Sequence, residues 1–158
     1  MAEGYSDLAN EVISAANGID YAYRDTGGSS EGAVPLVLLQ HFRGNLDNWD
    51  PALIDALAAT RRVVTFDNAG VGGSTGTTPD TVEQMDHALL QRLSGLRMPV
   101  LVMNGDSDPM ILPHYSYLLA GLVPQARVKI YPDSAHGFLS QHHGEFAADV
   151  DAFLTGAS

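Results

Sequence analysis

Residues 34–39 form an apolar run with no polar residue in it. A strand with one face in water alternates apolar and polar side chains, whereas a strand buried on both faces of a parallel sheet does not. The run leads into a polar, glycine-containing loop over residues 41–48. Asp50-Pro51 then supplies a helix N-cap residue and a residue suited to the first helical position. We therefore predict a central strand, a loop, and a helix that begins near residue 51.

Segments typical of strands and helices alternate along the rest of the chain. Asn17-Gly18 is typical of a hairpin turn between strands at residues 11–16 and 19–24. Further strands are expected at 62–66, 99–103 and 127–131, and helices at 51–59, 81–96, 113–122 and 144–154. This pattern predicts an α/β three-layer sandwich with a mainly parallel sheet of about six strands. The expected strand order is 1-2-4-3-5-6, in which residues 100–103 pair in parallel with 36–39.

Composition excludes several classes of partner. The chain has 158 residues, with 19 acidic and 8 basic side chains, and a formal net charge of -11, so nucleic acid is a poor partner. No apolar run has the roughly 18 to 20 residues of a membrane span, and the N-terminus lacks a signal-peptide pattern. There is no cysteine, which fits a reducing compartment. We expect a single domain over residues 1–158 that is soluble, cytoplasmic and without a membrane partner.

Four motifs follow expected strands in a fixed order. They are Gln40-His-Phe-Arg-Gly44 with Asn48-Trp49, Phe66-Asp-Asn-Ala-Gly-Val-Gly-Gly-Ser74, Gly105-Asp-Ser-Asp108 and Ser134-Ala-His-Gly137. In this order they resemble the landmarks of the α/β-hydrolase family, over about residues 13–154. The resemblance implies an oxyanion loop at His41-Phe42, a catalytic acid at Asp108 and a catalytic base at His136. It also implies hydrolysis of small esters, lactones or similar acyl compounds, without a cofactor.

The middle of the chain departs from the family pattern. The family places a strand, a G-x-S-x-G nucleophile elbow with its helix, and usually a cap between the glycine-rich loop and the acid strand. Here residues 81–85 resemble the helix before the elbow, and residues 89–99 already resemble the approach to the acid strand. We therefore expect a shortened form that lacks the elbow segment and cap, with weak or lost activity. The alternative is a non-catalytic scaffold or binding module of the same fold, natural or engineered by deletion.

Three serines are candidates for a nucleophile. Ser74 is the centre of a literal G-x-S-x-G at residues 72–76, but Thr-Gly-Thr-Thr-Pro follows it where an elbow needs a helix. We interpret Ser74 first as a loop serine, with a nucleophilic role as the alternative. Ser107 and Ser134 lie in sequences typical of turns. An Asp-His pair without a serine could still act as a general base on water or on an acidic C–H.

Other polar residues have simpler interpretations. His41 is expected to hydrogen-bond within its own loop, and Arg43 to pair with Asp67 or Asp47, with a substrate anion as the alternative partner for Arg43. His142 and His143 are adjacent, so their side chains point in different directions, and no metal is expected. The sequence also predicts too few helices to cover both faces of a large sheet, so we expect a homodimer.

Overall fold

The computed structural model describes residues 4–28, 33–40, 44–78 and 93–156. The chain divides into two compact units, one within residues 1–78 and 143–158 and the other within residues 79–142. A single domain over residues 1–158 stays a prediction.

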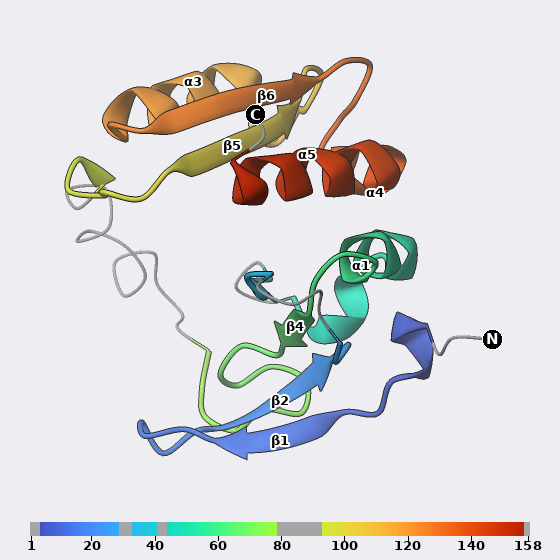
Figure 1. Ribbon diagram of the computed structural model, residues 1–158. Coiled ribbons are helices and arrows are strands. Elements are labelled where there is room, and N and C mark those ends of the chain that lie inside the picture. Colours follow the sequence, from blue (N-terminus) through green and yellow to red (C-terminus); the bar gives the residue numbers. More distant parts are fainter. Residues whose placement is uncertain (1–3, 29–32, 41–43, 79–92, 157–158) are drawn as a thin grey trace. The chain divides into compact units, whose positions relative to one another are not determined.

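The first unit contains a four-stranded sheet in the order β1-β2-β4-β3. Figure 1 labels β1, β2 and β4 of this sheet. Its strands are β1 (Glu11–Ser14), β2 (Asp20–Asp25), β3 (Leu36–Leu38) and β4 (Val63–Phe66). β1 and β4 both run antiparallel to β2, and β3 runs parallel to β4. Gly18 has a φ of 78° in the turn between β1 and β2, a conformation that glycine adopts without a steric penalty. The hairpin predicted from Asn17-Gly18 is confirmed.

Two helices of the first unit, α1 (Pro51–Ala58) and α5 (His143–Thr155), pack together (Figure 1). The carboxylate of Asp50 accepts the N–H of Ala52 at 2.9 Å, which caps α1 at the residue the sequence indicated. α1 buries Leu53, Ile54 and Leu57. Two short 3-10 helices, η1 (Tyr5–Asp7) and η2 (Leu46–Asn48), complete this unit.

The second unit contains β5 (Val100–Gly105) and β6 (Ala126–Tyr131), which pair in parallel, with Gly105 opposite Tyr131. α3 (Pro113–Leu122) contacts both strands, and α4 (Phe138–Gln141) follows β6. The stacked rings of Tyr131 and Phe138, 5.3 Å apart, are part of its core.

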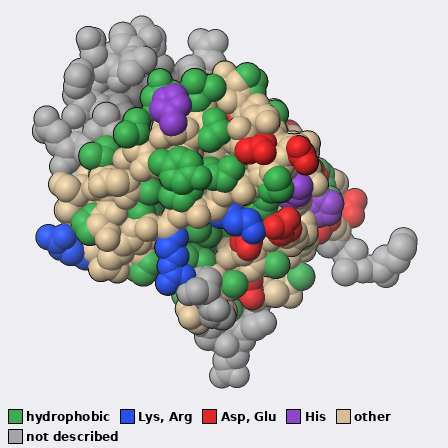
Figure 2. Space-filling view, turned by 90° about the horizontal axis from the view of Figure 1, so that it is seen from above, with side chains coloured by type: hydrophobic (Ala, Val, Ile, Leu, Met, Phe, Trp, Pro, Cys, Tyr) green, Lys and Arg blue, Asp and Glu red, His purple; other side chains and the backbone are tan. Residues whose placement is uncertain are grey.

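Hydrophobic side chains are also visible at the surface in Figure 2. α3 buries only Ser116 among its residues, and it carries several exposed apolar ones, namely Tyr115, Tyr117, Leu118, Leu119 and Leu122. Within the described part of the chain, no helix has the length and apolar character needed to cross a membrane.

Two predictions about the sheet are wrong. β3 lies at an edge, and Val37 on it is 58% exposed, so the apolar run is not a central strand. β5 pairs with β6 and not with β3, so two small sheets, one of them mixed, replace the six-stranded parallel sheet. An apolar run indicates that a strand favours burial, but it does not specify the neighbouring strand. The order within each sheet agrees with the prediction. Most of the predicted helix at 81–96 lies outside the described residues.

Candidate active site

The carboxylate of Asp108 is held in a turn that follows β5. Its Oδ1 accepts the backbone N–H groups of Met110 at 2.8 Å and Ile111 at 3.0 Å. The side chain of Asp108 is 1% exposed. An aspartate that accepts the N–H groups two and three residues ahead fixes both its own rotamer and the turn. The side chain therefore has one defined orientation.

His136 follows β6 and lies against this carboxylate. Its Nδ1 is 2.8 Å from Oδ2 of Asp108, and its side chain is 55% exposed. The two residues that resemble the family's acid and base are thus hydrogen-bonded to each other, although they are 28 positions apart in the sequence.

Asp108 is ionised at neutral pH because its hydrogen bonds outweigh its burial. Burial raises the pKa of Asp108, but the N–H of Ile111, the imidazole of His136 and the N–H of Met110 lower it, and the net pKa is below the ordinary value. An ionised carboxylate can only accept hydrogen bonds, so Nδ1 of His136 carries the proton. The Nε2 lone pair of a neutral His136 is then free to accept a proton.

The loops after β5 and β6 pack backbone to backbone. A Cβ at Gly105 would lie 2.2 Å from the carbonyl oxygen of Ser134 and 2.6 Å from that of Ala135, so only glycine fits there. The N–H of Ser107 donates to the same Ser134 oxygen at 2.9 Å. This close approach brings the segment that carries His136 next to the segment that carries Asp108.

The hydroxyl groups of the three serines considered from the sequence are engaged in internal hydrogen bonds. Ser134 is 1% exposed, and its hydroxyl donates to the carbonyl of Pro132 at 2.8 Å. The same hydroxyl oxygen is hydrogen-bonded to Nε2 of His142 at 2.6 Å. Ser107 donates to the carboxylate of Asp106 at 2.8 Å. These two serines therefore stabilise turns, as their sequence context indicates.

Ser74 joins its glycine-rich loop to the sheet of the first unit. Its hydroxyl donates to the carbonyl of Asp67 at 2.8 Å and accepts the N–H of Ala22 at 2.9 Å. The carboxylate of Asp67 accepts the N–H groups of Leu46 and Gly73, both at 2.7 Å. The literal G-x-S-x-G thus forms a loop with a structural serine at its centre.

The predicted oxyanion loop is not among the residues that the structure describes. His41, Phe42 and Arg43 lie outside the described residues, so their roles stay predictions. Asp47, one of the partners considered for Arg43, forms an ion pair with Arg24 at 2.8 Å. No group of three or more potential metal ligands occurs within residues 4–28, 33–40, 44–78 and 93–156.

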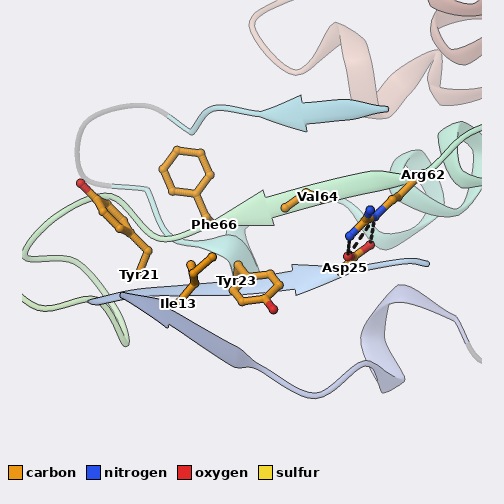
Figure 3. A pocket seen from close by; sticks show the side chains of 7 residues that line it. All are labelled: Ile13, Tyr21, Tyr23, Asp25, Arg62, Val64 and Phe66. Carbon is orange, nitrogen blue, oxygen red and sulfur yellow. Dashed lines mark hydrogen bonds and ion pairs between the residues drawn. The ribbon is translucent and has the colours of Figure 1, made fainter. Parts of the chain in front are cut away.

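A cavity of about 520 Å³ lies on the sheet of the first unit (Figure 3). Its lining is mainly apolar and comes from β1, β2, β4 and the residue before β4: Ile13, Tyr21, Tyr23, Asp25, Arg62, Val64 and Phe66. Figure 3 shows Arg62 and Asp25 paired at one end and the rings of Tyr21 and Phe66 at the other. The cavity includes none of the predicted site residues, so we assign the chemistry from the Asp108–His136 geometry and not from cavity size.

Comparisons with known proteins agree on one fold. A family model described as "alpha/beta hydrolase fold" matches residues 81–142, which include Asp108 and His136. No curated protein matches the sequence. An alpha/beta hydrolase fold protein from Chitinophaga pinensis is 23% identical, with a TM-score of 0.73 over 93% of this chain and 97% of its own.

Two further solved structures are similar at lower identity. A CIB-like hydrolase from Thermoplasma acidophilum is 15% identical, with a TM-score of 0.73 over 93% of this chain and 97% of its own. A thermophilic esterase from Thermogutta terrifontis is 14% identical, with a TM-score of 0.72 over 94% of this chain and 98% of its own. At these identities the likeness shows the fold.

Proposed function

We propose that the chain, which has an alpha/beta hydrolase fold, hydrolyses small esters, lactones or similar acyl compounds, with His136 as a general base. The observation that carries this proposal is the 2.8 Å hydrogen bond between Nδ1 of His136 and the buried carboxylate of Asp108. Hydrolases and an esterase among the structures of similar fold support the reaction class.

The pair would act through water. Nε2 of His136 takes a proton from a water molecule, whose oxygen forms a bond to the acyl carbon as the carbonyl electrons move to oxygen. The tetrahedral intermediate collapses, the ester C–O bond breaks, and the leaving alkoxide receives the proton from the imidazolium. Asp108 stabilises the positive charge on His136 while the proton is held there.

We expect turnover to be slow. Water is a weaker nucleophile than an activated serine, and the expected loss of the elbow segment also removes one oxyanion donor. General-base catalysis alone contributes about 10² to 10⁴ in rate. Activity on activated esters should therefore exceed the uncatalysed rate while remaining far below that of a serine esterase.

One observation favours the alternative, a non-catalytic scaffold or binding module. The hydroxyl groups of Ser74, Ser107 and Ser134 are all engaged in internal hydrogen bonds, which leaves none of these three prepared for attack. In that case the Asp108–His136 pair would serve only to join two loops.

Hydrolysis of p-nitrophenyl acetate distinguishes the two proposals. We expect His136→Ala and Asp108→Asn to lower the rate at least about tenfold, because each removes part of the general base. His114 is exposed on α3, so His114→Ala controls for hydrolysis by any surface imidazole and should stay within about twofold of wild type. Equal rates in all four proteins would reject the catalytic proposal and support the scaffold.

A further inference from the structure

We propose that Asp106 is a positioning residue that holds the turn bearing His136 in place, so that the imidazole meets Asp108. The inference rests on the proposed function of His136 as a base, and it assigns a role to an acid that the family resemblance leaves unassigned.

The side chain of Asp106 binds the turn that precedes His136. Its Oδ2 accepts the N–H of Asp133 at 3.0 Å, and its Oδ1 accepts the N–H of Ser134 at 3.2 Å. The hydroxyl of Ser107 donates to the same Oδ1 at 2.8 Å. One carboxylate therefore accepts two successive backbone N–H groups of the turn and one hydroxyl from its own loop. Hydrogen bonds to an ionised acceptor are stronger than those between neutral groups.

The turn needs such support because of its backbone. Asp133 has a φ of 51°, the left-handed region, and it is the only non-glycine residue in that region among those the structure describes. An aspartate tolerates this conformation better than most residues but is not at its minimum there. The conformation directs the N–H groups of Asp133 and Ser134 to a single carboxylate.

The equal spacing of residues in the two loops explains how a change at Asp106 would alter the position of His136. Asp106 lies two residues before Asp108, and Ser134 lies two residues before His136. Side chains join the two loops at two successive points, Asp106 to Ser134 and Asp108 to His136, in addition to the backbone hydrogen bond from Ser107 to Ser134. A hydrogen bond at 2.8 Å is lost when its partners move apart by about 1 Å. Losing the first connection should therefore weaken the second.

The tautomer of His136 reports this coupling without any turnover. A hydrogen bond from Nδ1 to a carboxylate holds the proton on Nδ1, whereas a free neutral imidazole exchanges between its two tautomers. The ¹⁵N chemical shifts of Nδ1 and Nε2 in the full-length, histidine-labelled chain, recorded near pH 8.5, give the fraction of each form.

We expect the Nδ1–H fraction of His136 to fall by at least about twofold in Asp106→Ala, and by less in Asp106→Asn, which retains one carbonyl acceptor. Asp133→Asn is the matched control. It removes one negative charge from the turn that Asp106 binds, keeps the N–H, and suits a positive φ, so it should retain the wild-type fraction.

Backbone amide spectra show whether each variant is folded. A folded Asp106→Ala or Asp106→Asn with the wild-type Nδ1–H fraction would overturn the inference. If Asp106→Ala does not fold, Asp106→Asn decides. A wild-type chain without esterase activity, in which Asp106→Asn still shifts the tautomer, would reject the proposed function and leave the positioning role intact.

Discussion

Glycine is required at position 105 by the backbone of the neighbouring turn. Its missing side chain leaves room for the carbonyl oxygens of Ser134 and Ala135, which would lie 2.2 and 2.6 Å from a Cβ. Backbone atoms cannot move aside as the end of a flexible side chain can. The separation of His136 and Asp108 therefore depends on a residue that contributes no side chain.

Gly105→Ala should test this close approach. We expect the free energy of unfolding to fall by about 1–3 kcal/mol, because the added methyl group forces the two loops apart. Urea denaturation measures the change. A Cβ at Gly121 in α3 would have no neighbour within 4 Å, so Gly121→Ala should be neutral or stabilising by up to about 1 kcal/mol. Equal stability of Gly105→Ala and wild type would contradict the described contact.

At the level of elements, a buried arginine links α5 to the segment before β4 within the first unit. Arg61 is 3% exposed, forms an ion pair with Asp151 on α5, and donates to the carbonyl of Val34 at 3.1 Å. It lies two residues before β4 and within one compact unit with α5, although Asp151 is 90 residues later. One side chain thus connects the start of a strand to the last helix.

Arg61→Ala should destabilise the chain by roughly 1–3 kcal/mol, because it removes a buried guanidinium that pairs with the partly exposed Asp151 and leaves the Val34 carbonyl without its donor. The neighbouring Arg62 gives the control. Its side chain is 52% exposed and pairs with Asp25, so Arg62→Ala should cost much less. The urea midpoints of the two variants measure this difference in stability. A larger decrease of the midpoint in Arg62→Ala would contradict the role of Arg61 in linking α5 to the segment before β4.

The element pattern was predictable where the signal is local. The helix predicted at 113–122 is observed over the same residues, and α1 begins at Pro51, directly after the Asp50 cap, as expected. α4 was missed because four residues are too short to show helical periodicity. Strand pairing was predicted wrongly for β3 because an apolar run contains no information about its partner.

The candidate site was predictable for side chains that stand in motifs and not for contacts made by the backbone. Asp108 and His136 were selected from their motifs, and the structure brings them together. The contacts of Asp106 depend on N–H groups at Asp133 and Ser134, which any residue except proline provides. The one sequence feature that indicates a role for Asp106 is that it lies two residues before Asp108 in the same turn.

For the whole molecule, ionised carboxylates distributed over both units link stability to pH. Among the described residues, the pKa lies below its ordinary value for Asp25, Asp106, Asp108 and Asp151. The main cause is the hydrogen bond from Arg62 for Asp25 and that from Arg61 for Asp151. For Asp106 it is the hydroxyl of Ser107, followed by the N–H groups of Ser134 and Asp133.

Stability should therefore decrease in acid. A carboxylate whose pKa is lower in the folded chain contributes stability above its unfolded pKa, and this contribution is lost as the pH falls through the folded value. We expect the urea midpoint to be stable from about pH 7 to 5 and to fall from about pH 4.5 downward. In Asp106→Asn the urea midpoint should fall less steeply with decreasing pH than in the wild type. A midpoint that stayed constant down to about pH 3 would contradict these assignments.

We further propose that the chain forms a homodimer. The described residues expose apolar side chains on β3 and α3, including Val37 at 58% and Leu118 at 61%. Exposed apolar area of this kind commonly marks an association site, while the net charge of -11 opposes open-ended aggregation. Sedimentation equilibrium from micromolar to millimolar concentration should give twice the mass of one chain. The mass of one chain across that range would contradict the proposal.

The central claim is that His136, held by Asp108, acts on water without an acyl-enzyme. Stopped-flow release of p-nitrophenol from p-nitrophenyl acetate tests it most directly. We predict linear release from the first turnover, with no burst, and loss of the signal in His136→Ala. A burst of about one equivalent per chain that disappears in Ser74→Ala would contradict the claim and identify Ser74 as the nucleophile.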